Sequence, residues 1–290
     1  MENIQYPHQT LLEQAIEFEN DGLTNEAIAL YQNIITLSPD WSTPYYNLGL
    51  IYKYQCNWRE SFYYNQKAIE SDLNNEAAYW NLGIAATALN DWKTARQAWN
   101  FFGLKLEVNN DEVNMDLGSR PVRLNPNHNA EVIWARRIDP ARTIIESVPL
   151  PESNHRYNDL LLNDGAPVGY RISNGTEYPV FNELQLLRQS NFKTFSVVVN
   201  TDNQDEIDQL GLLCDKNDIG FEDWTTVRIL CKKCSEGIPH ENHDHDYKFS
   251  SDQLRNIGLA ATNKTTIENI LTEWRKITSV DYSGPTLELE

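Results

Sequence analysis

The residues best suited to chemistry lie together in the stretch RILCKKCSEGIPHENHDHDYK, residues 228–248. It contains two of the four cysteines and three of the six histidines of the 290-residue chain, namely Cys231, Cys234, His240, His243 and His245. Thiolate and imidazole groups are the usual ligands of tetrahedral zinc, and structural zinc sites take four of them. The stretch therefore predicts one zinc ion, held by both cysteines and two of the three histidines. The spacing leaves open which histidine is spare.

A structural role for this zinc is favoured over a catalytic one. Catalytic zinc keeps an open position for water beside a carboxylate base, and Glu236, Glu241, Asp244 and Asp246 are near enough in sequence to serve. However, five candidate ligands for four positions would saturate the ion, and no H-E-x-x-H helix is present. We expect no catalytic residues, with a zinc-dependent hydrolase as one alternative and an exposed polar loop without metal as another.

The segments around this loop predict an α+β domain over residues 194–290. TFSVVVN, TTVRILC and NIGLAAT are typical of strands, VDYSG is a possible last strand, and DNQDEIDQLGLLCDKND and KTTIENILTEWRKI have apolar residues at helical spacing. Their order is that of a ferredoxin-like split βαβ unit. The zinc loop, residues 231–248, would connect the second and third strands. Cys214, in the first helix, and Cys56, far from the loop, are expected to be buried packing residues.

An internal repeat occupies the N-terminal third of the chain. PYYNLGLIYKYQCNWRESFYYNQKAI aligns with AYWNLGIAATALNDWKTARQAWNFFG in a register that places Gly49 on Gly83. This pattern resembles the tetratricopeptide repeat, whose unit is a pair of antiparallel helices with a period of about 34 residues. The resemblance implies a helical solenoid over residues 1–110, with repeats at about 8–41, 42–75 and 76–109.

Solenoids of this kind present a groove lined by the first helix of each pair, and groove residues follow from the register. We expect a protein or peptide partner to bind there. Leu12, Glu13 and Ile16 stand where a clamp for acidic chaperone tails would need polar or basic groups, so that partner is disfavoured. Alternatively, the aromatic residues pack against the chain itself. The predicted partner-binding residues are Tyr46, Asn47, Lys53, Tyr54, Trp80 and Asn81, with Leu12, Ile16, Leu50 and Ile84 beside them.

The middle segment, residues 111–193, is predicted to be a small β-rich domain or barrel. Prolines punctuate its short apolar runs, and NDGAP and SNGTE are typical of hairpin turns. Its arginines could bind an anion, but no glycine-rich phosphate loop accompanies them, so pairing with Asp139, Glu146 or Glu152 is favoured. The arginines are Arg120, Arg123, Arg136, Arg137, Arg142 and Arg156.

The chain as a whole resembles a group of bacterial tetratricopeptide proteins that carry such a middle segment and a Cys/His metal loop. WARRIDPAR, VPLPES and CSEGIPHENHDHD carry the resemblance. It implies a multidomain α plus α+β architecture and no activity.

Charge and hydropathy narrow the functional classes. A formal charge of −18 opposes binding to nucleic acid or anionic membranes and favours basic partners. No apolar run is long enough to cross a bilayer, and the start of the chain has no apolar signal segment, so we expect a cytoplasmic protein with reduced thiols. The favoured function is a protein-interaction scaffold or adaptor. An acidic inhibitor of a basic protein is the main alternative.

Overall fold

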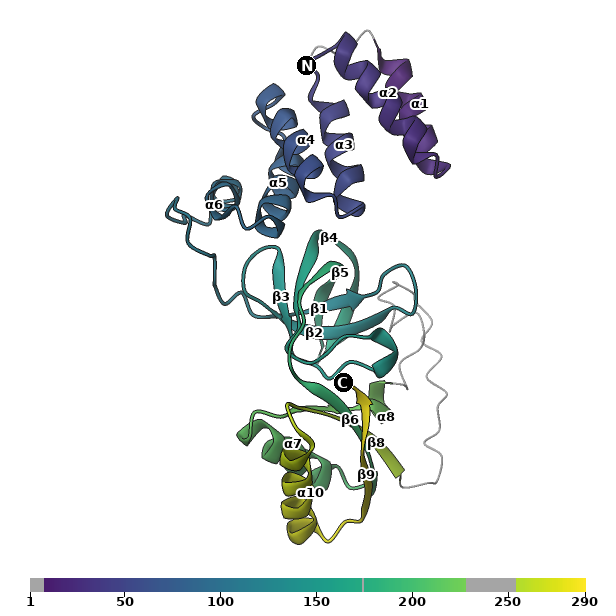
Figure 1. The fold of residues 1–290 in the computed structure, drawn as a ribbon, viewed down its shortest axis with the longest axis vertical. Helices are drawn as coiled ribbons and strands as arrows, with labels where there is room; N and C mark the ends of the chain where they lie inside the picture. Colours follow the sequence, from purple (N-terminus) through teal and green to yellow (C-terminus); the bar gives the residue numbers. More distant parts are fainter. Residues whose placement is uncertain (1–7, 174, 228–253) are drawn as a thin grey trace. The chain divides into compact units, whose positions relative to one another are not determined.

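The computed structural model describes residues 8–173, 175–227 and 254–290 (Figure 1). The chain forms two compact units, Met1–Asn114 and Met115–Glu290. The first is helical, and the second combines a β-barrel with an α+β sheet. The predicted general class, α followed by α+β, is confirmed. No helix in the described ranges is long and apolar enough to cross a membrane.

The described residues of the helical unit form six helices in three antiparallel pairs. The second helix of each pair starts at Thr24, Trp58 and Trp92, which are equally spaced along the chain. Their spacing is the period that the sequence predicts. The helices are α1 Gln9–Asn20, α2 Thr24–Leu37, α3 Ser42–Tyr54, α4 Trp58–Ser71, α5 Glu76–Ala88 and α6 Trp92–Phe101.

The turn inside each pair repeats the same backbone geometry. Gly22, Cys56 and Asn90 adopt left-handed φ angles of 74°, 54° and 58°. In each turn the next backbone N–H donates to a carbonyl five residues earlier, which is the Schellman arrangement that ends a helix. These bonds join Leu23 to Phe18 (2.8 Å), Asn57 to Tyr52 (2.9 Å) and Asp91 to Ala86 (2.8 Å). Cys56 is thus a half-exposed turn residue, and the prediction that it is buried is wrong.

Close packing inside each pair depends on a small residue in the first helix. A Cβ atom on Gly83 would lie 2.4 Å from the Trp99 ring, and one on Gly49 would lie 2.4 Å from the Asn65 amide. Ala15 occupies the equivalent position of the first pair, and Tyr31, Asn65 and Trp99 are all fully buried. The glycines therefore let a large side chain cross the helix backbone.

A closed five-stranded barrel begins the second unit. Neighbouring strands are antiparallel, and β1 closes the barrel by pairing in parallel with β5. Its interior is apolar, with Val122, Leu124, Ile133, Ile145 and Leu161 in one cluster. The strands are β1 Ser119–Leu124, β2 Glu131–Arg137, β3 Arg142–Ile145, β4 Leu160–Ser173 and β5 Thr176–Arg188, and the short helix η1, Pro151–Ser153, precedes β4.

One of the two predicted hairpin turns in the barrel is wrong. SNGTE does lie where β4 meets β5, since Ser173 pairs with Thr176. NDGAP instead lies inside β4, where the register shifts between Asn163 and Pro167. Asp164 Oδ1 accepts the N–H of Gly165 at 2.7 Å. The turn-forming residues therefore make a bulge in a long strand.

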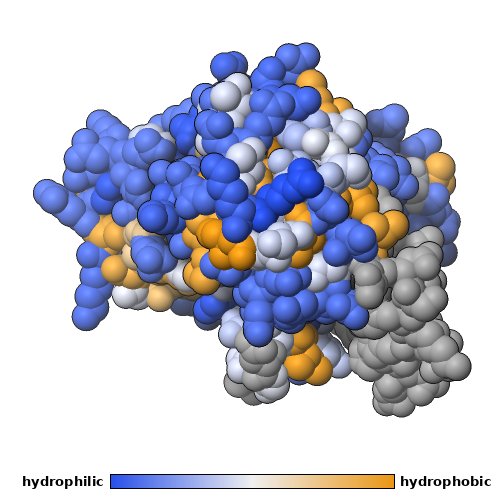
Figure 2. Space-filling model, turned by 90° about the horizontal axis from the view of Figure 1, so that it is seen from below, coloured by the Kyte–Doolittle hydropathy of each residue, from blue (hydrophilic) through white to orange (hydrophobic). Residues whose placement is uncertain are grey.

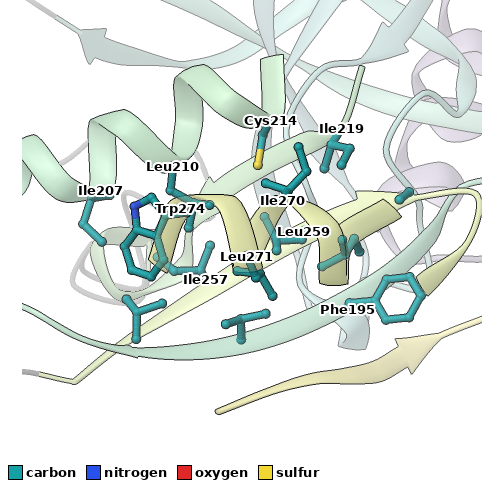
Figure 3. Packing of buried hydrophobic residues seen from close by; sticks show 14 of the residues in the cluster. Phe195, Ile207, Leu210, Cys214, Ile219, Ile257, Leu259, Ile270, Leu271 and Trp274 are labelled. Carbon is teal, nitrogen blue, oxygen red and sulfur yellow. The ribbon is translucent and has the colours of Figure 1, made fainter. Parts of the chain in front are cut away.

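The rest of the second unit is a four-stranded antiparallel sheet in the order β7-β8-β6-β9. Helices α7 and α10 pack on it and bury a core that includes Phe195, Leu210, Leu259 and Trp274 (Figure 3). Cys214 points into this core, where burial raises the pKa of its thiol to about 12. The elements are β6 Lys193–Asn200, α7 Gln204–Lys216, β7 Gly220–Asp223, α8 Trp224–Val227, β8 Leu254–Ala261, α10 Lys264–Thr278 and β9 Tyr282–Leu289.

The predicted strand TTVRILC is wrong for its first three residues, Thr225–Val227, which belong to the short helix α8. Trp224 is buried, and its indole N–H donates to the Val148 carbonyl of the barrel at 2.8 Å. Asp223 Oδ1 accepts the N–H of Thr225 at 3.0 Å, which caps the turn. These contacts outweigh the strand propensity of threonine and valine.

Candidate metal centre and partner groove

The five predicted zinc ligands, Cys231, Cys234, His240, His243 and His245, fall in residues 228–253, outside the described residues. Within residues 8–173, 175–227 and 254–290, no group of three or more histidine, cysteine, aspartate or glutamate side chains could hold a metal. The zinc site therefore stays a prediction.

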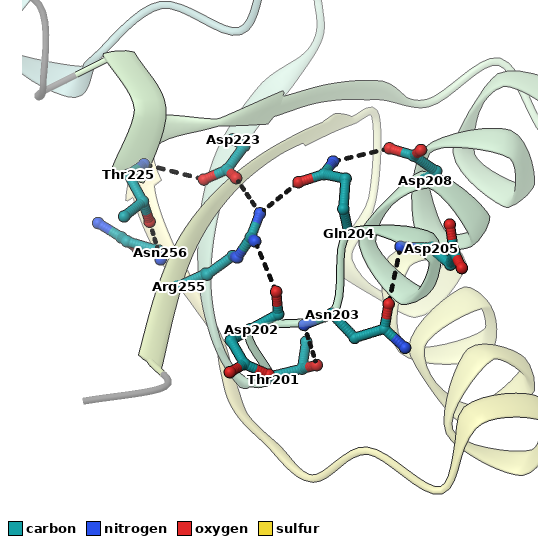
Figure 4. A network of polar contacts seen from close by, with 10 residues as sticks. All are labelled: Thr201, Asp202, Asn203, Gln204, Asp205, Asp208, Asp223, Thr225, Arg255 and Asn256. Atoms are coloured by element: carbon teal, nitrogen blue, oxygen red, sulfur yellow. Dashed lines mark hydrogen bonds and ion pairs between the residues drawn. The ribbon is translucent and has the colours of Figure 1, made fainter. Parts of the chain in front are cut away.

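The chain on either side of residues 228–253 is held together by a polar network (Figure 4). Arg255 Nη1 lies 3.0 Å from Asp223 Oδ2, and the N–H of Asn256 donates to Thr225 Oγ1 at 2.7 Å. Arg255 also donates to Gln204 Oε1 at 2.8 Å. Because β7 and β8 also pair in the same sheet, contacts among the described residues fix both flanks of the segment.

The six predicted groove residues differ in exposure. Tyr54 is 60% exposed, Tyr46 and Asn47 are half-buried, and Lys53 and Asn81 are buried. The Lys53 Nζ atom lies 4.5 Å from the centre of the Tyr54 ring. Tyr54 is therefore the predicted groove residue with the most side chain available to a partner.

Two of these residues also stabilise the helical unit. The Trp80 ring, half-buried, packs edge-on against Trp99 and Phe102, with ring centres 5.3 Å and 5.0 Å away. Asn47 Nδ2 donates to the Tyr31 hydroxyl at 3.0 Å, and that hydroxyl donates to Glu19. A substitution of Trp80 would consequently change the packing of α5 on α6 as well as any contact with a partner.

Two surface pockets lie away from the predicted groove. One, of about 460 Å³, lies among α4, α5 and α6 over Ile69, Leu82 and the stacked rings of Tyr79 and Phe101. The other, of about 630 Å³, lies in the second unit beside α7 and β7. The face of the molecule in Figure 2 is mainly hydrophilic and is broken by separate hydrophobic patches.

The second unit buries Glu131, which the sequence did not single out. Glu131 is 8% exposed, and both of its carboxylate oxygens accept the N–H of Leu150, at 3.2 Å and 3.1 Å. Burial raises the pKa of Glu131 to about 7, and the negative charges of Glu222 and Glu152 add to the effect. Burial also raises the pKa of Glu222. Glu131 is the first residue of the predicted strand EVIWARRI. Nothing in the sequence around it indicates that its carboxylate is buried.

A buried histidine–carboxylate pair lies nearby. His155 Nε2 is 2.7 Å from Glu183 Oε1, and His155 Nδ1 is 2.9 Å from the Ser153 carbonyl oxygen. Both neighbours are acceptors, so the doubly protonated imidazolium satisfies both ring nitrogens. Burial lowers the pKa of His155, but the hydrogen bond and charge of Glu183 outweigh it and the pKa is raised. The Ser153 hydroxyl donates to Leu150, so the histidine does not activate it as a nucleophile.

The arginines of the middle segment are engaged within the second unit. Arg142 Nε lies 2.5 Å from Asp139 Oδ2 in a fully buried pair, and Arg136 Nε lies 3.5 Å from Glu146 Oε1. Pairing with these two acids is thus confirmed for Arg136 and Arg142. Arg137 lies over the Phe181 ring at 4.8 Å. Arg156 donates to the main-chain carbonyl of Glu290.

Comparison with known proteins identifies no family for this chain. No protein-family model matches it, and no curated protein sequence matches it.

Proposed function

We propose that the protein is a protein-interaction scaffold whose helical unit is a tetratricopeptide solenoid. The observation that carries the proposal is the recurrence of one helix pair at a constant spacing, down to the left-handed turns at Gly22, Cys56 and Asn90. Repeats of this kind stack into extended surfaces that bind other proteins. Tyr46 and Tyr54 on α3 and Trp80 on α5 supply the anchors.

Tyr54 is the proposed centre of the groove, with Tyr46 about two turns earlier on the same helix. A side chain that is 60% exposed in the free protein has much surface to bury against a partner, and tyrosine is enriched among residues that dominate interface energies. Trp80 contributes less than the sequence predicts, since its ring already packs on Trp99 and Phe102.

The sheet of the second unit is proposed to be ferredoxin-like, with a structural zinc in residues 231–248. In the part of the domain that the structure describes, the element order is β-α-β-β-α-β once the short helix α8 is set aside, and the sheet order is β7-β8-β6-β9. The ion would be held by Cys231, Cys234 and two of His240, His243 and His245. The fixed flanks at Asp223 and Arg255 support a structural role, because the ion would order a loop whose ends already meet.

Replacing Tyr54 with alanine should weaken partner binding by on the order of 2 kcal/mol, the usual cost at an interface hot spot. The melting temperature should change little, because most of the ring is exposed. Tyr63→Ala on α4 is the matched control, since Tyr63 is 51% exposed on the second helix of the same pair. The measurement compares how much partner protein wild type, Tyr54→Ala and Tyr63→Ala each retain from extract of the native cell. Equal retention by the two variants would remove the groove from the proposal.

Purified protein should carry about one zinc ion per chain, as expected for a single four-ligand site. Replacing both Cys231 and Cys234 with serine should abolish zinc binding and lower the melting temperature of the second unit. Cys56→Ser is the control and should keep the metal. Metal analysis of protein prepared without chelators provides the readout. A zinc-free wild-type protein, or a double variant that keeps its zinc, would contradict the assignment.

A further inference from the structure

The pocket beside α7 is a groove with an apolar floor and an acidic rim. Ile219 and Phe221, on the strand side, and Tyr157 of the barrel form the floor. Leu212, which is 70% exposed, projects beside them from α7. We call this pocket the acidic groove. Its apolar residues offer a partner surface that is already partly exposed to water.

The rim of the acidic groove carries carboxylates. Asp208 and Asp215 are exposed on α7 and flank Leu212, and Glu146 lies on the barrel side. Within the described residues, the lining contains no lysine or arginine. A cation in contact with the rim is Arg136, 3.5 Å from Glu146. Burial raises the pKa of Tyr157, the negative charges of Glu146, Asp218 and Asp215 add to this effect, and Arg136 opposes it.

A helix-interior glycine keeps the floor open. Gly211 lies in the middle of α7, where glycine is an unfavourable residue. A Cβ atom at this position would lie 3.5 Å from the Phe221 ring, in ordinary contact. Alanine would therefore fit without strain but would cover part of the ring. Gly211 therefore makes helix α7 less stable than alanine would, and it leaves the Phe221 ring accessible to a partner.

We propose that the acidic groove binds an extended, arginine- or lysine-containing segment of a partner protein. The aliphatic stem of such a side chain can lie on Leu212 and Phe221 while its charged end reaches a carboxylate. Asp208 and Asp215 are seven residues apart on a helix, or about 10 Å along its axis. In a peptide in the polyproline II conformation, which has three residues per turn and rises about 3.1 Å per residue, side chains i and i+3 lie on the same side about 9 Å apart. The preferred ligand thus has two basic residues at positions i and i+3 with an apolar residue between them.

The test uses the full-length protein and a fluorescein-labelled peptide with arginines at i and i+3 flanking a leucine. A matched peptide replaces both arginines with citrulline, which has the same shape without the charge. Fluorescence anisotropy should show binding of the arginine peptide only. Exposed ion pairs contribute up to about 1 kcal/mol each, so Asp208→Asn with Asp215→Asn should weaken binding about tenfold. Higher salt should weaken it further.

Three further variants separate a specific groove from the general acidity of the chain. Glu273→Gln removes one exposed charge from α10 and should leave the affinity unchanged within about twofold. Gly211→Ala should keep or raise the melting temperature yet weaken peptide binding, which unfolding cannot explain. Tyr63→Ala, exposed on α4 of the helical unit, should bind the peptide normally. The proposal is overturned if wild type does not bind the arginine peptide, if the citrulline peptide binds equally well, or if Glu273→Gln loses as much affinity as the aspartate variant.

Discussion

Replacing Asp139 with alanine should destabilise the second unit by about 3–5 kcal/mol, the cost of breaking a buried ion pair by removing one partner. Asp139 is fully buried in the turn between β2 and β3, and its Oδ2 atom lies 2.5 Å from Arg142 Nε. Its Oδ1 atom accepts the N–H groups of Ala141 and Arg142, both at 2.7 Å. Alanine would remove the carboxylate from a buried guanidinium and leave two backbone donors without this acceptor.

Calorimetry of the full chain should show a loss of roughly 10 °C in the transition of the second unit, given about 2–4 °C per kcal/mol for a domain of this size. Asp139→Asn should cost less, because its amide oxygen still accepts the two N–H groups. Asp281→Ala is the control, since its pair with Arg275 is exposed and worth less than about 1 kcal/mol. The double variant Asp139→Ala with Arg142→Met should recover part of the loss. If Asp139→Ala lowered the melting temperature less than Asp281→Ala does, the pair of Asp139 with Arg142 would not stabilise the turn between β2 and β3.

The helical unit was predictable because one period fixes many positions at once. A small residue at 49 or 83 and a turn residue at 56 or 90 each satisfy a local requirement that recurs once in every repeat. The exposure of individual groove residues was not predictable in the same way. The exposure of each aromatic side chain depends on which other residues its ring packs against, as the contact of Trp80 with Trp99 shows.

The second unit shows where local signals fail. The residues Asn163 to Pro167 have turn chemistry, but the same chemistry forms a bulge when the pairing of β4 with β5 continues beyond it. Thr225 to Val227 favour a strand locally, and the burial of Trp224 directs the chain into a helix. The acidic groove joins residues from α7, β7 and the barrel, so only the spacing of Asp208, Leu212 and Asp215 on one helix face could have indicated it.

The stability of the second unit should fall as the pH rises, and Glu131 should be a main cause. Burial raises the pKa of Glu131 from its ordinary 4.5 to about 7, so between these values the folded protein binds a proton that the unfolded chain has lost. The free energy of unfolding therefore decreases as the pH rises from about 4.5 to 7, by about 3 kcal/mol in total. The raised pKa values of Glu222 and His155 act in the same direction.

Glu131→Gln isolates this contribution, because the amide stays neutral and its oxygen can still accept the N–H of Leu150. At pH 8 the variant should be more stable than wild type by about 2–3 kcal/mol, whereas at pH 4.5 the two should be nearly equal. Urea unfolding followed across this pH range measures the difference. Glu273 is exposed on α10, so the free energy of unfolding of Glu273→Gln should depend on pH in the same way as that of wild type. If Glu131→Gln were instead less stable than wild type at pH 8, the ionised carboxylate would be stabilised by its neighbours and the sign of the pH dependence would be reversed.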